Sequence, residues 1–339
     1  MSRVAVVGAT GYAGGELVAL LARHPRAELT GVFASPGGSA VPFAALHPSL
    51  ASRRGPRVAP FSPAAMRGAA PDVVFLATPN EASADLVPAL LESGIRVVDL
   101  SGAYRLSDAE SYPKWYGFAH PAPHLLKEAV YGLSEWCDGT LRGARLVANP
   151  GCYPTSVVLP LRPLAPILAP GAPIVCDSAS GVSGAGKKAD LAFSFAELAG
   201  NFKAYGVGTH RHEPEMRQAL GLADEASFVF VPHLLPLVRG ILTTLHVSFD
   251  RSVAAEEVAE LFSAAYASAP FVRLRPAGEL PELKDVVGTP RAEIGFVLLP
   301  GGRRAVLVSA IDNLLKGAAS QAVQNFNRMS DFEETEGLQ

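Results

Sequence analysis

The chain has 339 residues, of which 49% are hydrophobic, and a formal net charge of -3 at pH 7. This length accommodates two domains, and the composition indicates a packed globular protein rather than a disordered one. The mild negative charge argues against a protein that binds nucleic acid or an anionic membrane surface. The apolar runs are short and interrupted by glycine or proline, so none reaches the ~20 residues that span a bilayer.

The cysteines indicate a reducing environment. The three cysteines are Cys137, Cys152 and Cys176, an odd number whose spacing fits neither a disulfide scaffold nor a zinc site. We therefore expect a cytoplasmic protein without a bound metal. The N-terminus leads directly into a predicted strand, so we expect no signal peptide.

The first hundred residues alternate between strand and helix patterns. Short β-branched runs predict strands, and segments of helical periodicity between them predict helices. The predicted strands are residues 4–7, 28–33, 72–77 and 96–100, and the predicted helices are residues 16–23 and 82–91. This alternation predicts an α/β fold with a doubly wound parallel sheet. Residues 35–63, rich in proline and glycine, are expected to form a long excursion with only local structure.

A glycine-rich loop follows the first predicted strand and opens the first helix. Residues 8–14 read Gly-Ala-Thr-Gly-Tyr-Ala-Gly, a variant of the Gly-x-Gly-x-x-Gly pattern. Such a loop turns the chain sharply and lets a phosphate approach backbone N–H groups at the helix N-terminus. We interpret it as a dinucleotide-binding loop, with a plain strand-to-helix turn as the alternative. The cofactor-binding residues expected here are Gly8, Thr10, Gly11, Tyr12, Ala13 and Gly14.

The end of the second predicted strand bears on which dinucleotide binds. Folds of this kind that prefer NAD usually carry an acid there, which binds the ribose 2′-hydroxyl. Residues 33–37 read Phe-Ala-Ser-Pro-Gly and contain no acid, which favours NADP. Arg53 and Arg54 could reach the 2′-phosphate, or they could belong to a solvated loop.

The segment at residues 99–105, Asp-Leu-Ser-Gly-Ala-Tyr-Arg, lies just past the carboxyl end of a predicted strand. Ligands of open α/β sheets bind at such ends. Arg105 could hold a phosphate or a carboxylate with two parallel hydrogen bonds. A surface salt bridge is the alternative.

Cys152 stands between a predicted strand at residues 145–148 and a predicted helix at residues 156–161. The surrounding sequence, residues 149–155, reads Asn-Pro-Gly-Cys-Tyr-Pro-Thr. The positive end of a helix dipole favours the thiolate, which is the nucleophilic form of cysteine. Gly151 permits a tight turn just before the sulfur. We interpret Cys152 as a nucleophile, with a buried inert thiol as the alternative.

After Cys152 fewer helices separate the strands, which predicts a mixed or antiparallel sheet. The predicted strands are residues 174–177, 228–231, 242–249, 294–299 and 304–311, with a helix at 252–267. Residues 316–328 are predicted to form one amphipathic helix that returns to the first domain, and the acidic tail at 331–336 is expected to fray. The predicted domains are therefore residues 1–149 with 312–339, and residues 150–311.

Two segments of the second domain suit catalysis. Residues 180–187, Ser-Gly-Val-Ser-Gly-Ala-Gly-Lys, offer small side chains to a cofactor or phosphate, with a flexible loop as the alternative. Residues 205–215 hold His210, His212 and Glu215. A thiol nucleophile needs a group that takes and returns a proton, and a histidine can do both. Glu215 follows His212 by one helical turn and could orient its imidazole. Exposed surface histidines are the alternative, and a zinc site lacks a third ligand.

Several of these segments, in this order, resemble the N-acetyl-gamma-glutamyl-phosphate reductase family. The cysteine segment and the pattern His-Arg-His-Glu-Pro-Glu at residues 210–215 carry the resemblance most specifically. The supporting segments are residues 8–14, 116–121, 131–135, 180–187 and 312–318. The resemblance covers residues 3–328. Two departures are the lack of a basic residue after the second strand and Lys187, where relatives often have arginine.

The resemblance implies an NADP-binding Rossmann domain and an α+β catalytic and oligomerisation domain of the semialdehyde dehydrogenase type, in a homodimer or homotetramer. It implies NADPH-dependent reduction of N-acetyl-L-glutamyl 5-phosphate to N-acetyl-L-glutamate 5-semialdehyde and phosphate, in arginine biosynthesis, through a thioester on Cys152. His212 is then the acid/base, supported by Glu215, with His210 as the neighbouring candidate. Substrate or phosphate contacts are expected from Arg105, Asn149 and Arg211. Further cofactor contacts are expected from Ser180, Ser183, Gly184 and Asn313.

Three other functions compete with this one. A related enzyme would reduce a carrier-protein-linked aminoadipyl or glutamyl phosphate in lysine biosynthesis, for which a basic surface is expected. An aspartate-semialdehyde dehydrogenase would lack the His-Arg-His arrangement. A nonenzymatic NADP-binding redox sensor would pair Cys152 with Cys137 or Cys176 as a resolving thiol.

Overall fold

The computed structural model describes residues 1–50, 55–137, 139–187, 189–222 and 227–339, and Arg53 and Arg54 lie outside them. The chain divides into two compact units. Unit 1 comprises residues 1–151 and 318–339, and unit 2 comprises residues 152–317. None of the helices in the described part of the chain has both the length and the apolar composition that a bilayer crossing requires.

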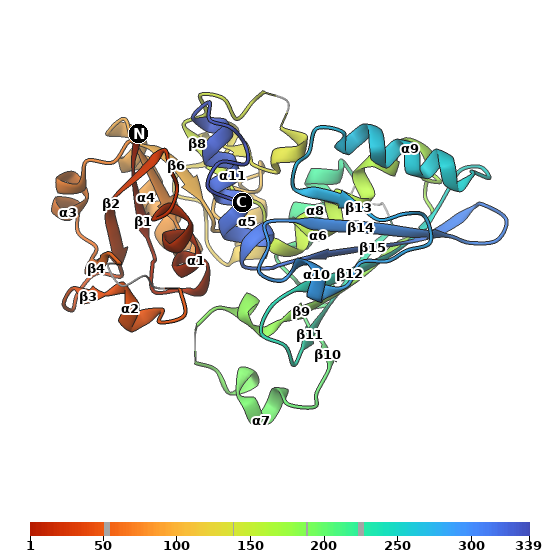
Figure 1. The fold of residues 1–339 in the computed structure, drawn as a ribbon, viewed down its shortest axis with the longest axis horizontal. Helices are drawn as coiled ribbons and strands as arrows, with labels where there is room; N and C mark the ends of the chain where they lie inside the picture. Colours follow the sequence, from red (N-terminus) through yellow and green to blue (C-terminus); the bar gives the residue numbers. More distant parts are fainter. Residues whose placement is uncertain (51–54, 138, 188, 223–226) are drawn as a thin grey trace. The chain divides into compact units, whose positions relative to one another are not determined.

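Unit 1 contains the parallel sheet that the alternating pattern predicted (Figure 1). Its strands are β1 (Ser2–Val7), β2 (Ala27–Ala34), β3 (Val41–Pro42), β4 (Arg57–Pro60), β5 (Val73–Leu76), β6 (Arg96–Asp99), β7 (Val130–Tyr131) and β8 (Leu146–Ala148). The strand order is β3-β4-β2-β1-β5-β6-β8-β7, and every neighbouring pair is parallel except β3 with β4. The central strands are buried on both faces, which explains their continuous apolar sequence.

Helices cover both faces of this sheet. They are α1 (Tyr12–Leu21), α2 (Phe43–Leu46), α3 (Pro63–Ala69), α4 (Asn80–Glu92), α5 (Ser111–Tyr116) and α11 (Ser320–Met329). On one face Ala5 and Val7 share a core with Met66 of α3 and Val87 of α4. On the other, α1 packs against α11, and the rings of Phe75 and Phe326 meet edge to face.

The proline- and glycine-rich excursion is more ordered than predicted. β4 pairs in parallel with the end of β2, and β3 pairs with β4, so the excursion adds two strands to the sheet edge. The prediction of only local structure was therefore wrong. Val58 of β4 is buried, so part of this segment belongs to the core although its composition is rich in proline and glycine.

The C-terminal segment also departs from the prediction. Residues Leu315–Ala319 form a π-helical turn, η6, and α11 follows it. The predicted amphipathic helix has no solvated polar face, because Gln321, Gln324 and Asn325 are all buried. Printed partners from unit 1 accompany the burial of two of them: Gln324 donates to Glu135 at 2.9 Å, and Asn325 donates to the carbonyl of Gly132 at 2.7 Å.

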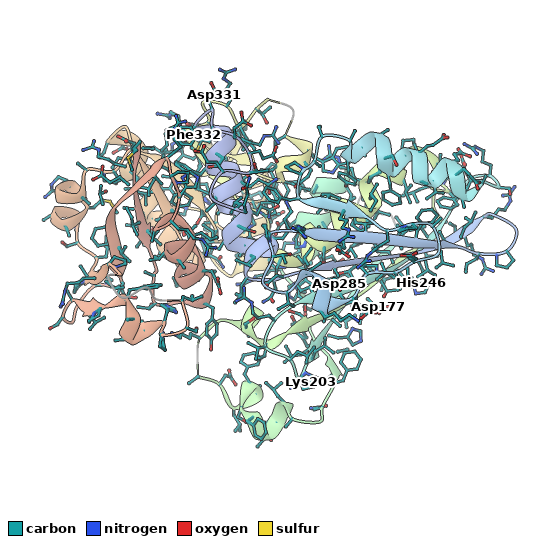
Figure 2. The ribbon with its side chains drawn as sticks, in the orientation of Figure 1. Asp177, Lys203, His246, Asp285, Asp331 and Phe332 are labelled. Carbon is teal, nitrogen blue, oxygen red and sulfur yellow. The ribbon has the colours of Figure 1, made fainter. Side chains whose placement is uncertain are left out.

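The acidic tail is not frayed. Asn327 donates to the backbone carbonyls of Glu334 and Glu336 at 3.1 and 2.8 Å. Phe332, labelled in Figure 2, packs against Phe326, and the guanidinium carbon of Arg26 lies 4.4 Å from the centre of its ring. The prediction overlooked these contacts because the partners are distant in sequence.

Unit 2 is built on a mixed sheet, as predicted, with the order β10-β11-β9-β12-β15-β14-β13. Its strands are β9 (Ile174–Gly181), β10 (Lys203–Ala204), β11 (Phe228–Leu235), β12 (Ile241–Ser248), β13 (Val272–Leu274), β14 (Ala292–Leu298) and β15 (Arg304–Ile311). Its helices are α6 (Cys152–Leu161), α7 (Phe195–Leu198), α8 (Glu213–Leu220), α9 (Ala255–Tyr266) and α10 (Leu283–Val286). α6 packs on β12 and β15, and α8 packs against α6.

α6 begins four residues earlier than predicted, at Cys152. Pro154 lies in the first turn of α6, where a proline lacks only an N–H that the helix does not use. Every residue from Tyr153 to Leu161 is buried, whereas Cys152 is partly exposed. The thiol is therefore carried by the first residue of a rigidly packed helix.

Candidate active site

The glycine loop of unit 1 depends on two of its glycines. Gly8 has a φ of 90°, and a Cβ on it would lie 2.2 Å from the carbonyl oxygen of Ala77. A Cβ on Gly14 would lie 2.3 Å from the carbonyl oxygen of Gly8. Gly11 stands at the N-cap of α1 and has no side chain that could occupy the helix N-terminus. Thr10, Tyr12 and Ala13 are at least partly exposed around it, so this end of α1 has the form of a phosphate cradle.

His47 contacts the backbone of this loop. The sequence did not indicate this role. Its buried ring places Nε2 2.8 Å from the carbonyl oxygen of Ala9. A Cβ on Gly15 would lie within 2.5 Å of the ring. The proline-rich excursion thus contributes a side chain to the dinucleotide-binding loop, which a prediction of purely local structure could not reveal.

Arg105 and Asn149 hold the segment that leads to Cys152. Arg105 is buried and donates from Nε to the carbonyl oxygen of Asn149 at 2.8 Å and from a terminal nitrogen to that of Leu100 at 2.7 Å. The surface salt bridge considered for Arg105 is therefore wrong. The Asn149 amide nitrogen lies 3.3 Å from the carbonyl oxygen of Ala318, and its oxygen accepts from Asn325 at 3.0 Å. These contacts favour a supporting role for both residues over a direct hold on substrate.

Cys152 packs against a glycine in unit 2. A Cβ built on Gly317 would lie 2.7 Å from the Cβ of Cys152, so the backbone of η6 lies directly beside the thiol-bearing residue. A π-helical turn often marks a functional site, where it changes the side of the helix that a residue faces. The inert, fully buried thiol considered for Cys152 does not match its partial exposure at a helix N-terminus.

His210 and His212 both contact Tyr153, the residue that follows Cys152. The Tyr153 ring meets the rings of His210 and His212 edge to face, with centroids 5.4 and 5.9 Å away. The two imidazoles lie 4.8 Å apart. The Tyr153 hydroxyl is 3.0 Å from that of Tyr205. The structure therefore brings the predicted nucleophile segment and the predicted acid/base segment together within unit 2.

The two histidines differ in their electrostatics. The backbone N–H of His212 donates to Nδ1 of His210 at 3.1 Å, which leaves the proton of a neutral His210 on Nε2. Burial, with a smaller contribution from the charge of Arg211, lowers the pKa of His210 to about 4. His210 is therefore neutral near pH 7. The alternative of exposed surface histidines is wrong, because His212 is only 8% exposed.

The remaining predicted residues of the histidine segment flank this pair. Glu215 is completely buried in the first turn of α8, which begins at Glu213, directly after His212. Arg211 lies between the two histidines in sequence and is exposed. It therefore offers a cation that an anionic ligand can approach.

The second glycine-rich segment is an ordered structure. The N–H groups of Val182 and Ser183 donate to the carbonyl oxygens of Leu237 and Val238 at 2.8 and 3.0 Å. Asn313 donates to Ser183 Oγ at 2.9 Å and accepts from the Gly240 N–H at 2.7 Å. The flexible loop considered for this segment is therefore wrong. Ser180, Ser183 and Asn313 lie together, and Gly184 is next to them because its Cβ would be 3.6 Å from the Asn313 amide nitrogen.

The other two cysteines have different surroundings. Burial raises the pKa of the Cys176 thiol to about 12. Cys137 is buried in unit 1 and donates to the carbonyl oxygen of Tyr131 at 3.0 Å. Among the described residues, no group of three histidine, cysteine or acidic side chains could hold a metal ion.

Family models match both units. A model described as semialdehyde dehydrogenase, NAD binding domain, matches residues 3–144, and one described as semialdehyde dehydrogenase, dimerisation domain, matches residues 152–313. Curated proteins named N-acetyl-gamma-glutamyl-phosphate reductase align along the whole chain. The one from Halorhodospira halophila is 48% identical over 345 residues, covering 100% of this chain and 98% of its own. The one from Escherichia coli is 44% identical and covers 100% of both.

The chain belongs to the N-acetyl-gamma-glutamyl-phosphate reductase family. It is an oxidoreductase of the semialdehyde dehydrogenase fold, and unit 1 is its nicotinamide-dinucleotide-binding domain.

Solved structures agree on the fold. Aspartate semialdehyde dehydrogenase II from Vibrio cholerae, complexed with ASA, has a TM-score of 0.71 at 18% identity and covers 97% of this chain and 98% of its own. The enzyme from Candida albicans, solved with NADP, has a TM-score of 0.66 at 16% identity and covers 97% and 99%. At these identities the structural likeness establishes the fold of this chain and gives no information about its substrate.

Proposed function

We propose that this chain reduces N-acetyl-L-glutamyl 5-phosphate to N-acetyl-L-glutamate 5-semialdehyde and phosphate with NADPH, a step of arginine biosynthesis. The observation that carries the proposal is Cys152 at the first residue of α6, with Tyr153 in contact with both His210 and His212. The names of the full-length relatives supply the substrate. They do not favour the carrier-linked substrate of lysine biosynthesis.

The glycine loop fits a dinucleotide. The loop formed by Gly8, Gly11 and Gly14 ends at the N-terminus of α1. Gly8 and Gly14 must be glycine for this loop to form, because a side chain at either position would collide with the backbone. When bound, the nicotinamide supplies the hydride that reduces the acyl group. The choice of NADP over NAD rests on the acid-free end of β2 and on the NADP-bound relative in fold. The cofactor contacts of Ser180, Ser183, Gly184 and Asn313 remain a prediction.

Acyl transfer to Cys152 is the first chemical step. The thiolate attacks the carbonyl carbon of the acyl phosphate, the C–S bond forms and the C–O bond to phosphate breaks, so phosphate leaves with its bonding electrons. The N-terminus of α6 favours the thiolate and the negative charge that develops on the carbonyl oxygen. The thioester accepts a hydride more readily than a carboxylate would, which is the benefit of the covalent route.

His212 is assigned the proton transfers. It takes the thiol proton before the attack and returns a proton when the thiohemiacetal collapses to aldehyde and free Cys152. His210 is a poor proton donor near pH 7 because its pKa is about 4. We assign His210 a positioning role, through the hydrogen bond from the His212 backbone to its Nδ1. Glu215, buried one turn beyond His212, is assigned the support of that imidazole.

Arg211 is the anion-binding residue that we favour. It is exposed and adjacent to both histidines in the chain, whereas Arg105 and Asn149 are buried and bonded to the protein. We therefore assign the substrate phosphate or carboxylate to Arg211. Arg105 and Asn149 fix the backbone that enters α6.

We assign homo-oligomerisation to the uncovered face of the unit 2 sheet. Along β11 the residues alternate, with Val229 exposed between the buried Phe228 and Phe230. Val175 of β9 pairs with Val229, and Asp177 and His246, labelled in Figure 2, occupy the same face. The family model for this unit is described as a dimerisation domain. A homodimer or homotetramer would cover these valines.

The experiment that tests the function is the reverse reaction. N-acetylglutamate 5-semialdehyde, phosphate and NADP are mixed with the protein, and NADPH formation is followed by absorbance. The proposal predicts turnover that requires phosphate, prefers NADP to NAD and disappears in Cys152→Ala. Absence of turnover in a protein that still binds NADPH would contradict it. Reversible disulfide formation by that inactive protein would support the redox sensor instead.

A further inference from the structure

Gly317, a residue without a side chain, lies directly beside Cys152 although it is distant from it in sequence. Its Cβ position lies 2.7 Å from the Cβ and 3.2 Å from the Cα of Cys152. The η6 backbone therefore occupies the space on one side of Cys152. Any movement of η6 relative to α6 would change the room available to the thiol.

Asp312 fixes the start of η6. Its carbonyl oxygen accepts the N–H of Gly317 at 2.9 Å, the hydrogen bond that closes the π-helical turn. Its side chain accepts the N–H groups of Leu314 and Leu315 at 2.8 and 3.1 Å, as an N-cap does. Both backbone and side chain of Asp312 thus determine where Gly317 lies.

Arg239 holds the Asp312 carboxylate in place. The guanidinium makes two parallel contacts, Nε to Oδ2 at 2.9 Å and a terminal nitrogen to Oδ1 at 3.1 Å. The Gly288 N–H donates to Oδ2 at 2.8 Å. The Asp312 side chain is fully buried, and a buried carboxylate is tolerated only when it is paired and hydrogen-bonded. A bidentate arginine also fixes orientation, which a lysine cannot do equally well.

We propose that the Asp312–Arg239 pair is a positioning device for the nucleophile, which acts through the backbone of Gly317 on Cys152. It rests on the proposed function only in taking Cys152 as the nucleophile. Neither Asp312 nor Arg239 is assigned any contact with substrate.

The pair should control the reactivity of Cys152 even in the absence of substrate. Arg239→Lys keeps the positive charge but cannot make the two parallel hydrogen bonds to Asp312, and Arg239→Met loses both the charge and the hydrogen bonds. We expect the rate of Cys152 alkylation by iodoacetamide at neutral pH to fall several-fold in Arg239→Met and less in Arg239→Lys. The pH midpoint of alkylation should rise in the same order. Mass spectrometry of the Cys152 peptide reports the rate, and Cys152→Ser gives the background from the buried thiols.

Turnover should follow the same order. A displacement of the nucleophile of about 1 Å can cost about 10²-fold in rate, so we expect kcat to fall by up to that factor in Arg239→Met and Asp312→Asn. Glu257→Gln is the matched control, because it removes an exposed ion pair of the same unit, with Arg251, and should change neither rate.

Gly317→Ala tests the contact between Gly317 and Cys152, through which the Asp312–Arg239 pair is proposed to act. The added methyl has no room beside Cys152, so kcat and alkylation should both fall. Gly68→Ala is its control, because nothing lies within 4 Å of that Cβ position. If Gly317→Ala does not fold, the two Arg239 variants decide, since that side chain is 22% exposed.

The proposal is overturned if folded Arg239→Met alkylates Cys152 at the wild-type rate with the wild-type pH midpoint. It is also overturned if Arg239→Lys and Arg239→Met behave alike. A wild-type protein without reductase activity would count against the proposed function alone, because alkylation needs no substrate.

Discussion

Cys152 and Cys176 both lie in unit 2, yet their surroundings differ sharply. Cys152 opens α6, is partly exposed and adjoins the tyrosine that touches both histidines. Cys176 is the third residue of β9 and is fully buried, and burial raises its pKa to about 12. This difference supports the proposal that Cys152 is the nucleophile, because a helix N-terminus favours the thiolate and a sheet interior suppresses it.

Removing each sulfur gives the largest contrast. Cys152→Ser should lower kcat by roughly 10⁴-fold or more, because a serine hydroxyl is not ionised near neutral pH. Cys176→Ser should leave kcat within about twofold, since its thiol takes no part in the chemistry. Steady-state reduction of NADP by the semialdehyde and phosphate measures both. Comparable losses in the two variants would remove the distinction.

The histidines give the next largest effect. His212→Asn should cost at least about 10²-fold in kcat, the usual contribution of an acid/base group. His210→Asn should cost about 10-fold or less, since a neutral, hydrogen-bonded imidazole only positions its neighbour. A greater loss in His210→Asn than in His212→Asn would show that the proton carrier has been assigned to the wrong residue.

The raised pKa of Cys176 should make the free energy of unfolding depend on pH in the alkaline range. In the unfolded chain its thiol ionises near its ordinary pKa of about 8.5, whereas in the folded protein it stays protonated up to about pH 12. The folded state then binds more protons than the unfolded state, so the free energy of unfolding falls as pH rises between these values. The contribution is about 1.4 kcal/mol per pH unit. Urea unfolding of wild type and Cys176→Ala at several alkaline pH values should show a shallower decline in the variant.

Cys137 should give the smallest effect. Its sulfur donates to the Tyr131 carbonyl, and a serine hydroxyl can make the same contact. We expect Cys137→Ser to change the free energy of unfolding by about 1 kcal/mol or less and to leave kcat unchanged. Thermal unfolding and the steady-state assay test this. A loss of activity would place Cys137 in the chemistry and revive it as a resolving thiol.

The sequence predicted those features that depend on neighbours along the chain. The strands β1, β2, β5 and β6 were predicted from the alternation of strand and helix patterns along the chain, and the glycine loop was predicted from its place between the first strand and the first helix. Cys152 and His212 could be selected as candidate site residues because cysteine after Pro-Gly and histidine before an acidic helix start are local patterns.

Features that depend on distant partners were not predictable. Asp312 meets Arg239, 73 residues away, and Gly317 meets Cys152 across most of unit 2. His47 meets Ala9 from within a segment that looked irregular. The polar residues of α11 look solvent-facing in sequence, but the fold buries them against backbone groups of unit 1. Contacts between residues so far apart in the chain leave no local pattern in the sequence from which they could be predicted.

A single-turnover experiment shows whether Cys152 carries the acyl group. The protein is mixed with N-acetylglutamate 5-semialdehyde and NADP in buffer without phosphate, so that the thioester forms but cannot be released to phosphate. We predict a burst of about one NADPH per active site and an N-acetylglutamyl adduct on the Cys152 peptide by mass spectrometry. A burst that persists in Cys152→Ser, or an adduct on another residue, would show that Cys152 does not carry the acyl group.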